Sequence, residues 1–381
     1  MIKIGFIGAL TKDWTGGINY FKNLLYALNI SKKGELEVYV FIGKKTDKVI
    51  RDIFDKYAVL VEDSIFDRNS LKWLIMKIEQ KIFKSNLLLE RVLKKNSIDI
   101  LSHSSLTGFK NIKTINWIPD FQHIYLPEMF SNEEIANRNR AYMSVIKDSN
   151  VVVVSSNDTL DHLKQFAPNY ITKTKVLSFV SQPCDSYHTI NEEKIFELKN
   201  KYKIENDFFY IPNQYWKHKN HILVFEAINQ LKSEGLEISL VCSGQLSDYR
   251  NKSHIKHLQN YIKENKLSNY VQLHGLIDYE DVFGLINISK AVINPSLFEG
   301  WSSTVEECKS VGKNMILSDL NVHKEQYPSA TFFERNSVES LKKILRDYQA
   351  LDSGLNIDSL SSRTRKFADS YIVISKEVVQ T

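Results

Sequence analysis

The residues best suited to chemistry lie between Asn294 and Cys308, in a run that carries Glu299 and, eight positions later, Glu307. An apolar run ends at Asn294 and a helical pattern starts around Ser303, so a loop leads from a strand into a helix N-terminus. The free N–H groups at such an end bind anions. Hydroxyl groups there come from Ser302, Ser303 and Thr304. Two carboxylates beside a phosphate site suit a hydroxyl-rich ligand, because each can accept hydrogen bonds from vicinal hydroxyls.

A purely structural role for the acids in this run is the alternative interpretation. Glu299 and Glu306 lie near the expected positive end of the helix. Acidic side chains at that end stabilise a helix by capping it, and this role needs no ligand.

The elements around this run alternate between strands and helices, which is typical of an α/β protein. In the C-terminal half we expect strands at 208–211, 238–242, 271–274, 291–294 and 315–318, and helices at 221–232, 254–264, 279–288, 304–311 and 338–348. In the N-terminal half we expect strands at 2–8, 38–42, 98–101, 114–118 and 151–154, a polar loop at 11–17, and helices at 18–28 and 132–147. The pattern predicts two successive α/β domains whose sheets face a cleft, with ligands at the carboxyl ends of the strands.

A basic segment between Lys72 and Lys95 is the strongest charge asymmetry in the chain. It holds seven basic residues (Lys72, Lys77, Lys81, Lys84, Arg91, Lys94 and Lys95) against the acids Glu79 and Glu90. Apolar residues at 75, 78, 82, 89 and 93 follow helical spacing. The segment is either a helix packed on the core with its lysines in solvent, or an amphipathic helix on an anionic membrane surface.

The composition excludes several classes of protein. Hydrophobic residues make up 43% and charged residues 25% of the 381 residues, as in ordinary globular proteins. The cysteines Cys184, Cys242 and Cys308 are odd in number and lack metal-site spacing, which argues against disulfides or zinc and for a reducing compartment. No signal peptide or membrane-spanning run is evident, so we expect a cytoplasmic protein. No nucleic-acid-binding motif accompanies the basic segment.

The run from Glu299 to Glu307, with Gly300 and Trp301 after the first acid, resembles the E-x7-E motif of the retaining GT-B glycosyltransferases of family 4. The likeness extends along the chain. Gly16-Gly17 resembles the N-terminal Gly-Gly loop of the family, and Lys219 stands where the family keeps a phosphate-binding lysine. His274-Gly275 is similar to the loop against the nucleotide base, and 318–325 to the segment after the last conserved strand.

The resemblance implies a GT-B fold, with an acceptor domain at 1–183, a nucleotide-sugar domain at 184–360, and a terminal segment, 361–381, packing back on the first domain. It implies that Glu307 binds the ribose, Glu299 the donor sugar and Lys219 the diphosphate. His123, in Trp117–His123, matches a histidine near the donor sugar, and Asp120 is a second candidate there. The implied catalytic group is His123, Lys219 and Glu299; the implied donor-binding group is Gly16, Gly17, Asn213, Lys219, Gly275, Glu299, Gly300, Ser302, Ser303, Thr304 and Glu307.

One departure from the family pattern concerns the phosphate clamp. The family usually has an arginine five or six residues before the lysine, where this chain has Gln214 and Asn213. Lys217 or His218 is a candidate to replace the missing cation. No D-x-D pair occurs in the chain, so the resemblance implies catalysis without a metal or other cofactor.

The predicted function is retaining transfer of a hexose-type sugar from a nucleotide sugar to a glycan or lipid-linked acceptor. The resemblance implies a place in bacterial surface polysaccharide synthesis, such as capsule or O-antigen, in the cytoplasm or peripherally on the inner face of the cell membrane. Two alternatives stay open: a sugar-nucleotide epimerase of the same fold, and a membrane-associated scaffold whose site has decayed.

Overall fold

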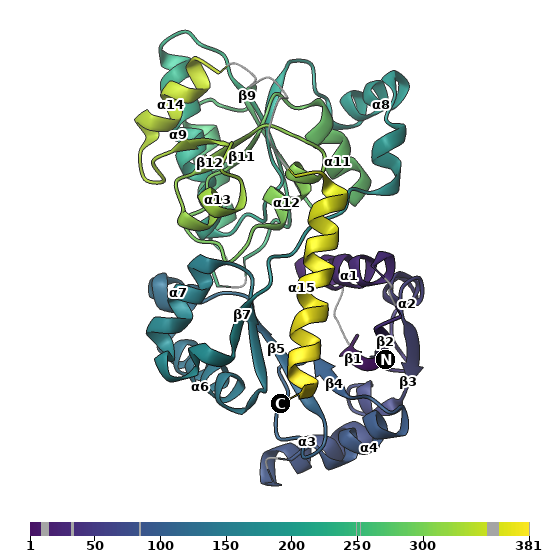
Figure 1. Cartoon of the computed structure of the whole chain (residues 1–381). Coiled ribbons are helices and arrows are strands. Elements are labelled where there is room, and N and C mark those ends of the chain that lie inside the picture. The colour runs from purple at the N-terminus through teal and green to yellow at the C-terminus, as the bar shows by residue number, and fades with distance from the viewer. Residues whose placement is uncertain are drawn as a thin grey trace. The chain divides into compact units, whose positions relative to one another are not determined.

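The computed structural model describes residues 1–8, 15–31, 34–83, 85–248, 250–251, 253–348 and 358–380, without the side chain of Thr15 (Figure 1). The chain divides into two compact units. The first unit comprises residues 1–121, 132–181 and the C-terminal stretch from 359; the second comprises 122–131 and 182–358. Each unit is a parallel sheet covered by helices.

The first unit has a seven-stranded parallel sheet in the order β3-β2-β1-β4-β5-β6-β7. Its strands are β1 (Ile2–Ile7), β2 (Leu36–Ile42), β3 (Val59–Glu62), β4 (Ile100–Ser102), β5 (Lys113–Ile118), β6 (Val151–Val154) and β7 (Thr174–Val176). The four valines of β6 are buried, as expected for a strand covered on both faces. The sequence prediction missed β3 and β7, the two edge strands, because their short runs include charged residues.

The helices of the first unit include a long C-terminal helix. They are α1 (Thr15–Ile30), α2 (Lys48–Asp55), α3 (Leu71–Phe83), α4 (Leu87–Lys95), α6 (Asn132–Asp148), α7 (Asn157–Phe166) and α15 (Leu360–Gln380), with 3₁₀ turns at Ser64–Phe66 and Pro168–Lys173. Helix α15, yellow in Figure 1, packs along α1 and β5. The ring of Tyr371 stacks on Phe6 with 6.1 Å between centroids, and Lys376 pairs with Glu35 at 2.6 Å. The last helix therefore completes the core of the unit that begins the chain.

Two predictions for the first unit are wrong. The loop expected at 11–17 ends earlier, because Gly16 and Gly17 lie in the first turn of α1; residues 11–14 lie outside the described residues. The basic segment 72–95 forms two helices, α3 and α4, rather than one, and Lys84 lies outside the described residues. The side chain of Glu79 accepts hydrogen bonds from Ser85 and from the N–H groups of Leu87 and Leu88, so it caps a new helix start.

The second unit has a six-stranded parallel sheet in the order β10-β9-β8-β11-β12-β13. Its strands are β8 (Phe208–Ile211), β9 (Ser239–Ser243), β10 (Val271–His274), β11 (Val292–Asn294), β12 (Met315–Ser318) and β13 (Thr331–Phe333). Alternate residues of β8 enter different cores: Phe209 and Ile211 one, Phe208 and Tyr210 the other. The sheet is thus buried on both faces, which explains its continuous apolar runs.

The helices of the second unit follow its strands. They are α5 (Gln122–Tyr125), α8 (Glu192–Tyr202), α9 (His221–Ser233), α10 (His254–Glu264), α11 (Tyr279–Ile288), α12 (Ser303–Ser310), α13 (Asn321–Gln326) and α14 (Val338–Arg346), with 3₁₀ turns at Pro127–Met129, Asp185–Thr189 and Lys217–Lys219. Strands β8, β10 and β12 and helices α10 and α11 have the predicted bounds. Helices α8 and α13 and strand β13 were not predicted.

Candidate functional site

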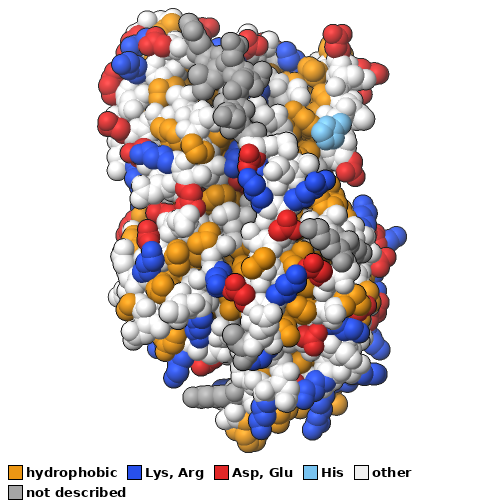
Figure 2. Space-filling model, in the orientation of Figure 1, with side chains coloured by type: hydrophobic (Ala, Val, Ile, Leu, Met, Phe, Trp, Pro, Cys, Tyr) orange, Lys and Arg blue, Asp and Glu red, His pale blue; other side chains and the backbone are white. Residues whose placement is uncertain are grey.

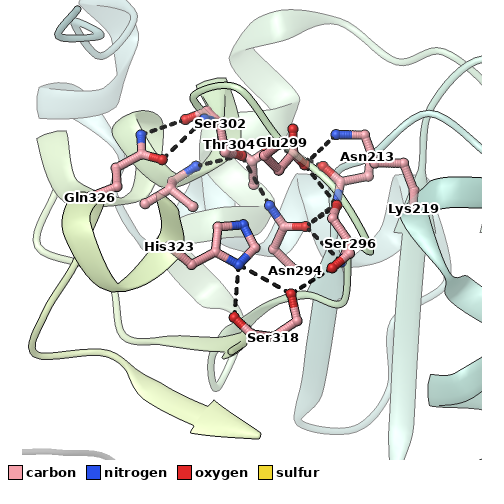
Figure 3. Close-up of polar contacts among 11 residues, drawn as sticks. Asn213, Lys219, Asn294, Ser296, Glu299, Ser302, Thr304, Ser318, His323 and Gln326 are labelled. Carbon is pink, nitrogen blue, oxygen red and sulfur yellow. Dashed lines mark hydrogen bonds and ion pairs between the residues drawn. The ribbon is translucent and has the colours of Figure 1, made fainter. Parts of the chain in front are cut away.

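The carboxyl ends of β8, β11 and β12 bring together three loops of the second unit (Figure 3). All strands of this sheet are parallel, so these loops emerge at one edge. The loop after β11 enters α12, whose N-cap is Ser302: its hydroxyl accepts a hydrogen bond from the N–H of Val305. The cap of α12 is therefore Ser302 and not Glu299, which removes the simple capping role for that acid.

Lys219 and Glu299 form an ion pair at the centre of this edge. The Lys219 Nζ lies 2.5 Å from the Glu299 Oε1, and the two side chains are 14% and 10% exposed. Burial would raise the pKa of Glu299, but attraction to Lys219 and hydrogen bonds from Lys219 and Ser296 outweigh it, so this pKa lies below its usual value. Glu299 is thus a carboxylate at neutral pH and lies against a buried cation.

Asn294, at the end of β11, holds the surrounding loops in place. Its Nδ2 donates to the Ser302 hydroxyl at 3.0 Å, and its Oδ1 accepts from the Asn213 Nδ2 at 3.2 Å. The Ser296 hydroxyl lies 2.7 Å from both the Asn294 Oδ1 and the Glu299 Oε1. Asn213 in turn accepts a hydrogen bond from the hydroxyl of Thr304 at 2.8 Å. Asn213 and Thr304, both predicted as donor-binding residues, are therefore joined, and Asn294 is the connecting residue that the sequence analysis did not single out.

His323 of α13 is a second residue of this site that the sequence analysis did not name. That analysis noted only the segment 318–325, which contains it. It is buried, and its Nδ1 lies 2.9 Å from the Ser318 carbonyl oxygen. Burial lowers its pKa, and Glu299 and the Ser318 carbonyl counteract this only in part. The ring is therefore neutral at pH 7 and donates to that carbonyl through Nδ1. Figure 3 shows His323 between Ser318 and the Glu299 loop.

Gln326, also on α13, fixes the start of α12. Its Oε1 accepts from the Ser302 N–H at 3.0 Å, and its Nε2 donates to the Ser302 carbonyl at 2.8 Å. Its Nε2 also donates to the buried Glu306, which pairs with Lys309. Glu306 therefore has a structural role, as the alternative interpretation proposed for it.

Glu307 lies one turn into α12 and is buried, 6% exposed. Its Oε1 accepts a hydrogen bond from the Tyr279 hydroxyl at 2.9 Å. Burial raises the pKa of Glu307 to about 7, and the Tyr279 hydrogen bond offsets only part of that effect. Glu299 and Glu307 thus lie on one loop and helix in two environments: Glu299 is paired with a cation, and Glu307 accepts a hydrogen bond from a tyrosine hydroxyl.

In the loop that carries Lys219, Gln214 and Asn213 occupy the positions at which the family usually has an arginine. The Gln214 Oε1 accepts from the Gln245 N–H at 2.8 Å and so ties this loop to the one after β9. His218 is buried, and burial together with the charge of Lys219 lowers its pKa well below the usual value. This lowered pKa argues against His218 as the replacement for the missing cation. Lys217 is exposed.

Gly275 follows β10, and its carbonyl accepts a hydrogen bond from the Gly244 N–H at 3.2 Å. A Cβ on Gly244 would lie 2.4 Å from the Asn213 carbonyl oxygen, so this close approach of loops requires glycine. Gly300 and Ser303 complete the predicted set in this unit; Gly300 is buried, and Ser303 is the first residue of α12.

His123 lies in α5, which belongs to the second unit although it follows a strand of the first. The segment around it is held by Arg250, whose Nη1 donates to the Gln122 Oε1 at 3.1 Å. The guanidinium carbon lies 5.4 Å from the Phe130 ring and 4.8 Å from the Trp216 ring. Arg250 thus connects the His123 segment to the Lys219 loop, a link between distant positions that no sequence motif signals.

Gly16, Gly17 and Asp120 belong to the first unit. Gly16 is exposed and Gly17 is buried in the first turn of α1. Asp120 is half-buried. The pKa of Tyr142 is raised mainly by the burial of its hydroxyl, and the negative charge of Asp120 adds to this effect. The hydroxyl of Ser156, which follows β6, caps α7 by accepting a hydrogen bond from the Thr159 N–H at 2.9 Å.

The described residues lack two kinds of feature. Within the described ranges, no group of three or more His, Cys, Asp or Glu side chains is arranged to hold a metal ion. In the same part of the chain, no helix is long and apolar enough to cross a membrane.

The second unit matches a known enzyme family. Residues 191–356 match the family model for glycosyl transferases group 1. No curated protein sequence matches the chain significantly.

Solved structures with similar folds cover the whole chain. A glycosyltransferase from Rickettsia africae is 17% identical with a TM-score of 0.69, over 100% of this chain and 98% of its own. HepE from Anabaena, in complex with UDP and glucose, is 14% identical with a TM-score of 0.65, over 100% and 99%. WaaG, a glycosyltransferase involved in lipopolysaccharide biosynthesis, is 14% identical with a TM-score of 0.58, over 99% and 98%.

The predicted GT-B fold of two Rossmann-like α/β units is therefore confirmed. The family match and the fold support a glycosyltransferase that depends on a sugar nucleotide. Membership of family 4 and retention of anomeric configuration stay predictions.

Proposed function

We propose that the enzyme is a retaining glycosyltransferase of family 4 that moves a hexose-type sugar from a nucleotide sugar to a glycan or lipid-linked acceptor. The observation that carries this proposal is the Lys219–Glu299 ion pair beside the N-terminus of α12, with Glu307 one turn further along. A cation and free helix N–H groups suit a diphosphate, and two carboxylates suit the hydroxyls of two sugars.

Each group then has a role set by its environment. Lys219 and the N–H groups of Ser303 and Thr304 bind the diphosphate, where negative charge accumulates as the bond to the sugar breaks. Glu299 is ionised and accepts hydrogen bonds from hydroxyls of the donor sugar. Glu307 accepts from the ribose hydroxyls. His123, which belongs to the same unit, completes the donor site as the family resemblance implies.

The proposed transfer breaks the bond between the anomeric carbon and the phosphate oxygen and forms a bond from the acceptor oxygen on the same face. The departing phosphate takes the proton of the acceptor hydroxyl. Lys219 and the α12 N-terminus stabilise the leaving group, and the proposal needs no metal for this step.

The donor and the biological role are proposed from the similar structures. HepE was solved with UDP and glucose, and WaaG is involved in lipopolysaccharide biosynthesis. We therefore infer that a UDP-hexose is the first donor to test and that the product belongs to a bacterial surface polysaccharide. No observation of this structure favours an epimerase or a decayed scaffold, since the ion pair and both acids are in place.

The first experiment is a thermal-shift panel of UDP-, GDP-, ADP- and dTDP-sugars. A ligand at about a hundred times its Kd stabilises the folded state by about 2.7 kcal/mol, so one nucleotide should stand out. Lys219→Met should abolish that shift, and Lys263→Met, which changes an exposed lysine of α10 outside the proposed site, should retain it.

The second experiment uses the donor found in this way with lipid and glycan acceptors. NMR of the product should show the anomeric configuration of the donor retained. An inverted product would overturn the retaining mechanism, and an altered nucleotide sugar formed without any acceptor would point to an epimerase.

A further inference from the structure

Helix α3 in the first unit turns its apolar face away from the core. Met76 is buried at 7% exposure, and Trp73 packs beside it on a core cluster. The opposite face carries Leu71, Ile75, Ile78 and Ile82, which are 74%, 48%, 55% and 65% exposed. Their spacing of four, three and four residues places them on one side of the helix. Of the two alternatives for this segment, core packing therefore describes Met76 and Trp73 of α3 but not the stripe on its opposite face.

The exposed apolar surface continues around the ends of this helix. Leu74 is 45% exposed, Phe83 71%, and Leu87, at the start of α4, 44%. By contrast, Leu89 and Leu93 of α4 are fully buried. The apolar residues of the basic segment thus divide into two groups: Met76 and Trp73 of α3 pack on the core together with Leu89 and Leu93 of α4, and the stripe on α3 stays exposed. Single exposed apolar side chains are ordinary, but a contiguous stripe indicates a binding surface.

Basic side chains flank this stripe. Lys77 and Lys81 lie along one side of it and Lys72 on the other, and all three are exposed. On α4, Arg91, Lys94 and Lys95 are exposed as well. Lys72 pairs with Asp63, and Lys94 approaches Glu90 at 3.7 Å. The amine of Lys77 contacts Gln80 and the Trp73 ring.

The two acids of the segment are occupied by internal contacts. Glu79 caps α4, as described above. Glu90 is 4% exposed and accepts hydrogen bonds from the N–H groups of Lys110 and Asn111 at 3.1 and 2.9 Å. The charge that this surface presents outward is therefore positive. In Figure 2, orange and blue side chains lie together at the lower end of the view, where Figure 1 places α3 and α4.

We propose that α3, with the flanking lysines of α3 and α4, binds the surface of an anionic lipid bilayer. An apolar stripe flanked by lysines matches a helix that lies in the plane of the headgroups, with its apolar face in the acyl boundary and its amines at the phosphates. Electrostatic attraction and apolar burial then act together on one face.

A second copy of the chain fits this surface less well. In a two-fold symmetric contact the same patch meets itself, so lysines would face lysines across the interface. An anionic bilayer satisfies both the apolar stripe and the amines, and no symmetry partner does.

The test is cosedimentation of the full chain with phosphatidylcholine vesicles that contain or lack phosphatidylglycerol, without any sugar nucleotide. Binding is expected only to the anionic vesicles and should weaken with salt. The variant Lys77→Gln/Lys81→Gln should bind about 30-fold more weakly. Its matched control is Lys256→Gln/Lys263→Gln on α10, where both lysines are exposed.

A second double variant, Ile78→Gln/Ile82→Gln, tests the apolar stripe. It should weaken binding to the anionic vesicles at least about tenfold. Its control is Phe196→Gln/Leu276→Gln, because each of those side chains is 67% exposed elsewhere. Circular dichroism should show all variants folded, since the changed side chains are at the surface.

Three results would overturn the proposal. One is no binding to anionic vesicles at low salt. Another is binding that neither double variant weakens. The third is a dimer in sedimentation velocity that Ile78→Gln/Ile82→Gln dissociates while vesicle binding is unchanged, which would assign the surface to a second copy. Because no donor is present, none of these results depends on the proposed transferase mechanism.

Discussion

Replacing the buried carboxyl of Glu307 should change the stability of the enzyme in a pH-dependent way. Burial raises the pKa of this group from 4.5 to about 7. Between these two values the unfolded chain releases the proton while the folded chain keeps it, so rising pH favours unfolding. At about 1.4 kcal/mol for each pH unit, the free energy of unfolding falls by about 3 kcal/mol across this window. Below pH 4.5 the group has no effect, because both states are protonated.

The isosteric variant Glu307→Gln cannot ionise and avoids this loss. It should match the wild type in acid and exceed it by about 3 kcal/mol at about pH 8. Urea unfolding from pH 5 to 8, followed by circular dichroism, measures the difference. Glu280→Gln, on an exposed acid of α11, is the control and should show no comparable pH-dependent gain.

The same variant tests the proposed ribose contact. Hydrogen bonds to a charged group contribute about 1.5–3 kcal/mol, so UDP should bind the variant at least about tenfold more weakly at pH 8. The gap should narrow below pH 7, where the wild-type carboxyl becomes protonated. A constant stability difference from pH 5 to 8 would refute the burial argument. Unchanged UDP affinity in calorimetry would refute the ribose contact alone.

Three further substitutions test the rest of the site. Lys219→Met removes the buried cation and should lower kcat/KM for transfer by about 10²–10³, whereas Lys263→Met, on an exposed lysine of α10, should keep near wild-type kinetics. Asn294→Ala removes hydrogen-bond partners from the buried side chains of Asn213 and Ser302 and should cost about 2–4 kcal/mol in urea unfolding, with the exposed Asn287→Ala as control. Arg250→Lys keeps the charge but loses the planar contact with Phe130 and Trp216. Faster amide hydrogen exchange of residues 122–130 is expected in that variant, and unchanged exchange would show that Arg250 does not hold them.

The sequence predicted the fold because its strands are buried on both faces. Runs such as Val151–Val154 and Phe208–Ile211 have no polar alternation, and the structure has both with the predicted bounds. Edge strands such as Thr174–Val176 carry charge and have no such run, so they were missed. The exposed face of α3 was also not predictable, because helical spacing shows that apolar residues share a face but not whether that face meets a core.

The sequence predicted contacts of the site between residues that are neighbours in the chain, but not contacts between residues that are far apart in it. Ser302, Ser303 and Thr304 are adjacent in sequence to the helix they start, so the α12 N-terminus could be read directly. The contacts of Asn294 with Asn213, and of Arg250 with Gln122, join residues 81 and 128 positions apart. Such pairings depend on strand order in the sheet, which no single motif specifies.

The ion pair of Lys219 and Glu299 is best understood as one unit. Each charge is mostly buried, and moving a charge out of water costs several kcal/mol unless a partner offsets it. Removing Lys219 alone therefore leaves the Glu299 carboxylate buried and unpaired, and the loss of activity in Lys219→Met mixes instability with loss of phosphate binding.

The double variant Lys219→Met/Glu299→Gln separates the two effects, because it leaves no buried charge behind. It should recover most of the about 3–5 kcal/mol that the single change costs in urea unfolding. It should recover none of the transfer activity, since both proposed donor contacts are gone. If activity returned with stability, Lys219 and Glu299 would be a structural pair, and the donor site would have to lie elsewhere.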